Sequence, residues 1–114
     1  MAHLQQLQFV KSVSASLASD YSNQKIIEIG SYDVNGSIRS FFNSKKYIGV
    51  DLTSGPGVDV VSSGDQVDHE DEAYDISISC ECFEHNPKWV ETFENMHRMT
   101  KKGGIVLKIG RAHV

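Results

Sequence analysis

The sequence predicts an α/β domain, built from a mostly parallel sheet of about five strands with flanking helices. Two observations predict this class. Five short apolar runs alternate along the 114-residue chain with helical segments or polar loops, and strands that alternate with helices in this way pair in parallel. The first run, "KIIEIG" at residues 25–30, is short, rich in Ile and ended by a glycine, as expected of a buried strand.

A helix is predicted over residues 3–19, before the first strand. Gln, Lys and Ser occupy one side, and the apolar residues recur at three- and four-residue steps at Leu4, Leu7, Val10, Val13 and Leu17. A single apolar stripe of this kind is typical of a helix that packs on a sheet. We expect that arrangement rather than a helix that binds a partner.

The remaining strands are predicted at residues 46–52, 58–61, 74–80 and 104–110. Residues 35–42 resume the spacing of a helix, and residues 53–57 ("TSGPG") have the composition of a turn. Residues 62–73 are polar and acidic, which predicts a solvated loop with at most a weak helical turn.

The last helix, over residues 86–104, has the clearest end signals in the chain. Asn86 is a capping residue type, and Pro87 suits the first helical position. Lys101 and Lys102 would face the negative end of the helix dipole, and Gly103 would end the helix.

Composition and charge argue against several functional classes. The chain is long enough for one domain over residues 1–114. Its formal net charge of −4 provides no basic footprint for nucleic acid or for an anionic membrane, and no apolar run approaches the roughly 20 residues that span a bilayer.

Two features of the sequence bear on the compartment. Cys80 and Cys82 are too close together to cross-link the fold, and the N-terminus lacks an apolar signal core. We therefore expect a cytoplasmic protein.

The turn after the first strand indicates a nucleoside ligand. The apolar run ends at Gly30, and small polar residues lead to a second glycine, Gly36. A dinucleotide fingerprint has another glycine where the backbone approaches the pyrophosphate, but Tyr32 occupies that position here and would crowd the phosphates. An NAD-dependent oxidoreductase is therefore the less favoured alternative. A nucleoside without phosphates makes no such demand.

Two acidic residues mark the same edge of the predicted sheet. Asp51 ends the second strand at an offset from Gly30 where an acid commonly accepts hydrogen bonds from ribose hydroxyls; the alternative is a solvated carboxylate. Glu28 lies inside the apolar run, where an unpaired carboxylate is costly. It either braces the N–H groups of the following loop or faces a cationic ligand, and the sequence leaves both open.

Five segments together resemble the class I S-adenosylmethionine-dependent methyltransferases, which have a Rossmann-like fold. They follow in the family's order from about Lys25 to Gly110 and read "IIEIGSYDVNGSIRSFF", "YIGVDL", "GPGVDVV", "YDISISCECFEH" and "MTKKGGIVLKIG". The resemblance implies S-adenosyl-L-methionine as the cofactor and methyl transfer to an unidentified small-molecule acceptor. The chain departs from the family's glycine-rich pattern at Tyr32 and Val34.

The resemblance also implies which residues bind the cofactor. The turn after the first strand would wrap the methionine part, a role that falls to Glu28, Gly30 and Ser31, with Asp33 nearby. Asp51 would bind the ribose.

The adenine and the rest of the cofactor would meet later segments of the chain. Leu52 would lie against the adenine, and Asp65 is the nearest match to the acid that meets the adenine amine. The segment after the fourth strand would lie along the cofactor, at Cys80, Glu81 and Cys82.

His85 is the candidate general base, because it lies near the predicted mouth of the site. A base is needed only where the acceptor loses a proton, and a role in shaping the loop is the alternative. Cys80, Cys82 and His85 also have the chemistry of metal ligands, but a structural zinc site usually has a second pair of ligands. We therefore expect no metal.

Family members normally continue past the fifth strand with further strands, whereas this sequence ends at Val114. The fifth strand would then be an edge, which natural proteins usually cover, and we expect a homo-oligomer formed through it. A catalytically incomplete cofactor-binding or assembly module is the non-enzyme alternative.

Overall fold

The computed structural model describes residues 4–18, 20–33, 37–79 and 87–109. The elements in chain order are α1 (Leu4–Leu17), β1 (Lys25–Ile29), η1 (Arg39–Phe41), β2 (Lys46–Asp51), β3 (Val60–Val61), η2 (Gly64–Gln66), β4 (Tyr74–Ser79), α2 (Trp89–Met99) and β5 (Thr100–Lys108). Two of them, η1 and η2, are single 3₁₀ turns.

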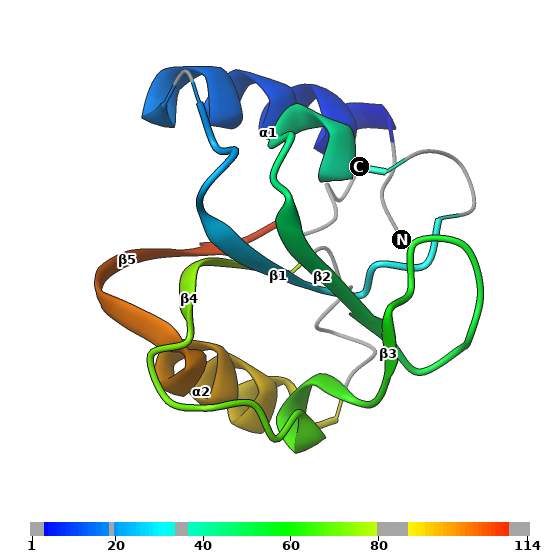
Figure 1. The fold of residues 1–114 in the computed structure, drawn as a ribbon. Coiled ribbons are helices and arrows are strands. Elements are labelled where there is room, and N and C mark those ends of the chain that lie inside the picture. The colour runs from blue at the N-terminus through cyan, green and yellow to red at the C-terminus, as the bar shows by residue number, and fades with distance from the viewer. Residues whose placement is uncertain (1–3, 19, 34–36, 80–86, 110–114) are drawn as a thin grey trace.

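The strands of the described residues form one sheet in the order β3-β2-β1-β4-β5, and all neighbours pair in parallel. The chain runs outward from β1 to β3 and then returns to β4 on the other side of β1 (Figure 1). The strand order therefore reverses between β1 and β4. Ligands of such sheets bind beyond the carboxyl ends of the strands at this switch point. The predicted α/β class with a five-stranded parallel sheet is confirmed.

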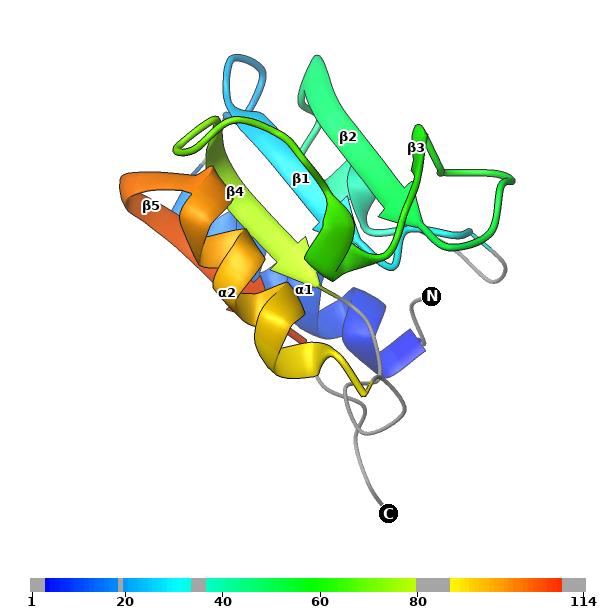
Figure 2. The same cartoon turned by 90° about the horizontal axis from the view of Figure 1, so that it is seen from below.

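Helices cover the two faces of the sheet. Figures 1 and 2 show α1 on one face and α2 on the other. Ile26 of β1 packs in one cluster with Val10 of α1, whereas the next residue, Ile27, packs in a second cluster with Met96 and Met99 of α2. Successive strand residues point to opposite faces. β1 is therefore buried on both faces from Ile26 to Ile29, and Glu28 is its one buried polar residue.

The core-facing side of α1 differs in part from the predicted stripe. Val10 is fully buried, and Leu7 and Ala18 pack against the same cluster, but Leu17 is 44% exposed. Ser14 is buried in place of Leu17. The helix is turned so that residues 7, 10 and 14 face the sheet, with Ala18 just after its end, and the prediction for Leu17 is wrong.

The start of α2 lies later than predicted. Lys88, rather than Asn86, precedes the first helical residue, Trp89. Pro87 is in a turn before the helix, so its predicted place at the first helical position is wrong. Asn86 lies outside the described residues.

The end of α2 lies earlier than predicted, because Lys101, Lys102 and Gly103 belong to β5. Thr100 ends the helix: its backbone is extended, with φ −94° and ψ 136°, and its Oγ1 donates to the carbonyl oxygen of Met96 at 2.6 Å. A β-branched residue favours the extended backbone, and here its hydroxyl satisfies a carbonyl of the last helical turn. A glycine is therefore not needed to stop the helix.

Two other segments are shorter than predicted. The described part of residues 35–42 contains a single turn, η1, instead of a longer helix. The predicted strand at residues 58–61 is reduced to Val60 and Val61, while η2 is the weak turn expected within residues 62–73. Among the described residues no helix is both long and apolar enough to cross a membrane.

Candidate functional site

The loop after β1 crosses over the carboxyl end of β2. Gly30 has φ +82°, a conformation that favours glycine, and it turns the chain so that the N–H groups of Gly30 and Ser31 both donate to the carbonyl oxygen of Val50, at 2.8 and 3.0 Å. The N–H of Asp33 then donates to the carbonyl oxygen of Pro56 at 2.8 Å. The loop is thus fixed between the end of β2 and the turn that follows it.

Glycines allow this close approach. A Cβ atom on Gly49 would lie 2.1 Å from the carbonyl oxygen of Gly57 and 2.6 Å from Ser31 Oγ. A Cβ atom on Gly55 would lie 2.4 Å from the ring of Tyr32. Tyr32 therefore packs over the turn at residues 53–57. Sequence reasoning missed these glycines, although a glycine inside a strand, as at Gly49, is a signal for close backbone approach.

Asp51 presents a fixed carboxylate at this edge. Its Oδ2 accepts the N–H of Tyr32 at 3.1 Å, and its Oδ1 accepts the N–H of Thr53 at 3.2 Å. A carboxylate offers about four acceptor positions, so each oxygen can still accept another hydrogen bond. The side chain is partly exposed, and the neighbouring Leu52 is 68% exposed. An oriented acceptor next to an apolar surface can hold a sugar hydroxyl beside a flat ring.

Ser31 contributes a second polar group. It is only 4% exposed, and its Oγ has no hydrogen-bond partner among the described residues. A buried hydroxyl without a partner loses its interactions with water and is destabilising by about 1–3 kcal/mol. The atom has almost no accessible surface and packs against β2 at Gly49, so this hydroxyl fixes how closely the loop lies on the strand.

Glu28 is buried on the α1 face, one strand residue before this loop begins. It is 4% exposed, and its Oε1 accepts a hydrogen bond from Tyr47 Oη at 2.7 Å. Burial raises the pKa of Glu28 to about 7, and the nearby carboxylate of Asp33 acts in the same direction. The Tyr47 hydrogen bond and the charge of Arg39 oppose this rise in pKa.

A polar chain connects Glu28 with the backbone of β2. Arg39 donates to the carbonyl oxygen of Tyr47 at 2.9 Å and lies 5.0 Å from the centre of its ring. The same guanidinium pairs with Asp59 Oδ2 at 3.0 Å, and this oxygen also accepts the N–H of Gly49 at 2.8 Å. Tyr47, the hydrogen-bond donor to Glu28, is therefore held from η1.

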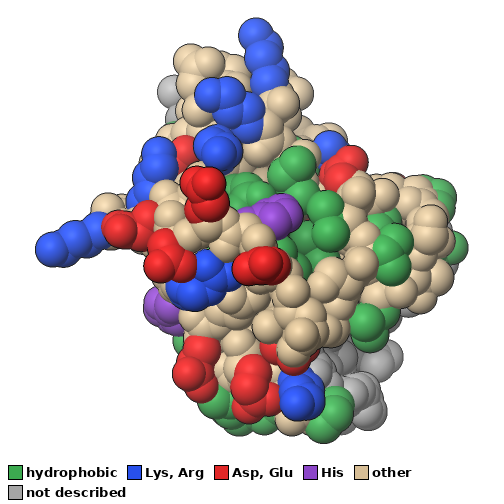
Figure 3. All heavy atoms as spheres, turned by 60° about the horizontal axis from the view of Figure 1, so that its bottom comes forward, with side chains coloured by type: hydrophobic (Ala, Val, Ile, Leu, Met, Phe, Trp, Pro, Cys, Tyr) green, Lys and Arg blue, Asp and Glu red, His purple; other side chains and the backbone are tan. Residues whose placement is uncertain are grey.

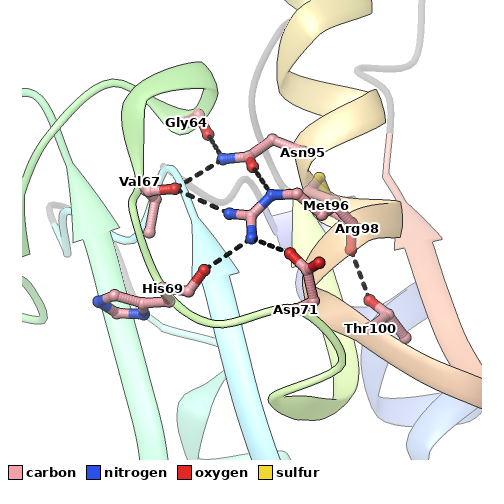
Figure 4. A network of polar contacts seen from close by, with 8 residues as sticks. All are labelled: Gly64, Val67, His69, Asp71, Asn95, Met96, Arg98 and Thr100. Atoms are coloured by element: carbon pink, nitrogen blue, oxygen red, sulfur yellow. Dashed lines mark hydrogen bonds and ion pairs between the residues drawn. The ribbon is translucent and has the colours of Figure 1, made fainter.

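The segment between β3 and β4 brings Asp65 to the same edge of the sheet. Asp65 lies on η2, and the preceding Gly64 is so close to β1 that a Cβ atom there would lie 2.8 Å from Ile29 Cγ2. The side-chain hydrogen bond from Gln66, together with one from Ser63, lowers the pKa of Asp65. Asn95 and Arg98 of α2 hold this segment by hydrogen bonds to its carbonyl oxygens (Figure 4).

The α2 face of the molecule is mixed in charge. Figure 3 shows Asp and Glu side chains interspersed with Lys and Arg, next to an area of hydrophobic side chains. An ion pair joins the guanidinium of Arg98 to Asp71 Oδ1 at 2.6 Å.

Four residues from the sequence predictions cannot be placed. Cys80, Glu81, Cys82 and His85 lie outside the described residues, so the predicted cofactor contacts and general base there stay predictions. Within the part of the chain that the structure describes, no group of three or more His, Cys, Asp or Glu residues could hold a metal ion.

The structure gathers several predicted site residues at the carboxyl edge of the sheet: Gly30, Ser31, Asp33, Asp51 and Asp65. Leu52 lies beside them, and Glu28 lies below the loop.

Comparison with known proteins gives one family and a set of similar folds. The family described as "Methyltransferase domain" matches residues 33–107. No curated protein gives a significant match. The structure of the YcgJ protein from Bacillus subtilis is similar, with a TM-score of 0.69 at 16% identity over 88% of this chain and 50% of that one.

Two further structures show the same likeness. One, from Bacillus halodurans and assigned to the methyltransferases, has a TM-score of 0.67 at 20% identity and covers 85% of this chain and 49% of that one. The other is a Haemonchus contortus phosphoethanolamine N-methyltransferase in complex with phosphomonomethylethanolamine and S-adenosylhomocysteine, with a TM-score of 0.68 at 20% identity over 91% of this chain and 28% of that one. The chain therefore spans half or less of the length of these structures.

Proposed function

Because the chain belongs to the methyltransferase domain family and has its class I, Rossmann-like fold, we propose that it binds S-adenosyl-L-methionine at the carboxyl ends of β1 and β2. We further propose that it transfers the methyl group to a small-molecule acceptor. The cofactor, when bound, supplies a methyl group on a positively charged sulfur. The protein binds and orients both molecules, and positioning contributes much of the rate of such a displacement.

The observation that carries this proposal is the fixed carboxylate of Asp51. Backbone N–H groups of Tyr32 and Thr53 hold its two oxygens from two different loops, and each oxygen can still accept a ribose hydroxyl. The exposed Leu52 offers an apolar surface to the adenine. The loop that contains Ser31 would wrap the amino-acid part of the cofactor.

Other residues complete the proposed site. Gly30 and Asp33 shape the loop that encloses the amino-acid part, and Glu28 below it provides a negative charge when it is ionised. Asp65 would accept a hydrogen bond from the adenine amine. Cys80 and Glu81 would lie along the cofactor, and His85 would take a proton from the acceptor where the acceptor must lose one.

Titration calorimetry with S-adenosylmethionine and S-adenosylhomocysteine tests the cofactor. We expect saturable heat with both ligands, and binding at least tenfold weaker in Asp51→Ala because a charge-assisted hydrogen bond is lost. Asp68→Asn is the matched control, since it removes one carboxylate charge at an exposed position away from β2. Absence of heat in folded wild-type protein would overturn the proposed cofactor. An Asp51→Ala variant that binds as tightly as Asp68→Asn would overturn the ribose assignment.

A catalytically incomplete cofactor-binding or assembly module of the same fold is the second candidate. The two functions differ in one measurement. Wild-type protein that binds the cofactor and transfers its labelled methyl group to a member of a small-molecule panel is an enzyme, whereas cofactor binding without transfer across the panel favours the module.

We also propose self-association through β5. Among the described residues this nine-residue strand is the last in the sheet order and pairs with β4. Edge strands offer backbone groups to another strand. Sedimentation velocity should therefore show a sedimentation coefficient that rises with protein concentration. A single monomeric species at all concentrations would contradict the proposal.

A further inference from the structure

We infer that Asn95 and Arg98 are positioning residues for recognition of the adenine ring: from α2 they fix η2, and η2 determines where the Asp65 carboxylate lies. The inference rests on the proposed function. It adds two residues that neither touch the cofactor nor lie at a strand end, and it predicts their effect on ligand specificity.

Asn95 holds both ends of η2. Its Nδ2 donates to the carbonyl oxygen of Gly64 at 2.8 Å and to that of Val67 at 3.0 Å (Figure 4). Its Oδ1 accepts a hydrogen bond from Arg98 Nε at 2.9 Å. Because a guanidinium can only donate, this contact fixes the orientation of the amide, with its nitrogen toward η2.

Arg98 extends the attachment along the rest of the segment. Its guanidinium donates to the carbonyl oxygens of Val67 and His69, at 3.2 and 2.7 Å, and to Asp71 Oδ1 at 2.6 Å. The backbone carbonyl of Arg98 in turn accepts the N–H of Glu72 at 2.9 Å. Residues 62–73 form no strand. The path of this segment therefore depends largely on side chains of α2.

Packing prevents η2 from moving toward the sheet. A Cβ atom on Gly64 would lie 2.6 Å from Thr92 Cγ2 and 2.8 Å from Ile29 Cγ2, so the turn is in close contact with both α2 and β1. The hydrogen bonds to Asn95 and Arg98 prevent movement in the opposite direction. The position of η2 is thus fixed relative to the end of β1, where the loop at Gly30 begins.

Asp65 is suited to distinguish an amine from a carbonyl group. Hydrogen bonds from Gln66 and Ser63 lower the pKa of Asp65, so the group is ionised near neutral pH and can only accept hydrogen bonds. The exocyclic amine of adenine donates a hydrogen bond, whereas the corresponding oxygen of hypoxanthine accepts one. A well-placed carboxylate therefore favours an adenosyl ligand over an inosyl ligand, and a displaced one does not.

The test compares dissociation constants for S-adenosylhomocysteine and S-inosylhomocysteine in wild type, Asn95→Ala, Arg98→Lys, Asp65→Ala and the Asn95→Ala/Asp65→Ala double variant. We expect wild type to prefer the adenosyl ligand by about tenfold, the typical contribution of one hydrogen bond to a charged group. Asn95→Ala should lower this preference at least threefold. The double variant should show the same preference as Asp65→Ala, because Asn95 acts through Asp65. Arg98→Lys, which keeps the charge but not the fork of donors, should have a smaller effect in the same direction.

Val10→Ala is the control for general loss of stability. Val10 is fully buried on α1, on the opposite face of the sheet from η2, so this variant should lose stability and keep the wild-type preference. An Asn95→Ala variant that weakens both ligands equally would overturn the inference, and so would wild-type protein without a preference. Wild-type protein that binds neither ligand would overturn the proposed function itself, and the inference with it.

Discussion

Replacing Glu28 with Gln is expected to remove a large part of the pH dependence of folding stability between about pH 4.5 and pH 7. Burial raises the pKa of Glu28 from 4.5 to about 7. The folded protein therefore keeps this proton at pH values at which the unfolded chain has released it. When the folded state binds more protons than the unfolded state, the free energy of unfolding falls as pH rises.

The size of the effect follows from the shift in pKa. A difference of one unit between the pKa values in the folded and unfolded states changes the free energy of unfolding by about 1.4 kcal/mol. The shift from 4.5 to about 7 therefore corresponds to about 3 kcal/mol. This stability is present below pH 4.5 and is lost by the time the pH exceeds 7. In Glu28→Gln the side chain is neutral at every pH. The difference in stability between variant and wild type should therefore grow by about 3 kcal/mol in favour of the variant from pH 4.5 to pH 8.

Urea unfolding at a series of pH values measures this difference. A changed hydrogen bond between Gln and Tyr47 would add a constant offset, so the change with pH is the quantity to compare. Tyr47→Phe is the opposing variant, because it removes the donor to Glu28 Oε1. Loss of this hydrogen bond should raise the pKa of Glu28 further, and the free energy of unfolding should then continue to fall at higher pH. Parallel pH profiles for wild type and Glu28→Gln would refute the reasoning.

Substitutions at three other positions test the packing of the loop and the end of α2. Gly49→Ala places a methyl group 2.1 Å from the carbonyl oxygen of Gly57 and should lower the free energy of unfolding by about 2 kcal/mol or more. Gly103→Ala is its control: Gly103 has φ +82° and a Cβ there would have no neighbour within 4 Å, so backbone strain alone should lower the free energy of unfolding by about 1 kcal/mol. Equal losses for the two variants in urea unfolding would contradict the packing argument. Thr100→Val removes a buried hydroxyl that also contacts Ser77 Oγ at 2.7 Å, and it should cost about 1–3 kcal/mol by thermal unfolding, most of which Thr100→Ser restores. A Thr100→Val variant as stable as wild type would show that the hydroxyl contributes nothing to stability.

The buried strands could be predicted from the sequence because their signal is local. β1, β2 and β4 lie within one residue of their predicted bounds. Each is a short run that contains Ile, Val or Tyr and is followed by turn or loop residues, so its limits are visible in the chain itself. The predicted parallel pairing then follows from the helices and loops between the strands.

The end of α2 could not be predicted in this way. Lys101, Lys102 and Gly103 have the pattern of a helix end, but Thr100 pairs with Tyr74 in the sheet, and this pairing begins β5 four residues earlier than predicted. The same limit applies to Leu17, whose exposure depends on how α1 is turned on the sheet. Both outcomes depend on contacts between distant segments.

The place of two candidate site residues in the fold was predictable, because it depends on strand ends. Asp51 and the loop at Gly30 lie at the edge where the sequence placed them. The close packing of Gly49 and the hydrogen bonds of Asn95 were not predictable, because they depend on which loops meet above the sheet. Asn95 in particular resembles any polar residue on the exposed side of a helix.

No residue separates α2 from β5: Met99 is the last residue of the helix and Thr100 the first of the strand. A displacement of the outermost strand is therefore passed directly to the helix, without a loop to absorb it. The same helix carries the amide that restrains the Asp65 turn. A substitution in β5 that shifts the strand should therefore also shift the position of η2.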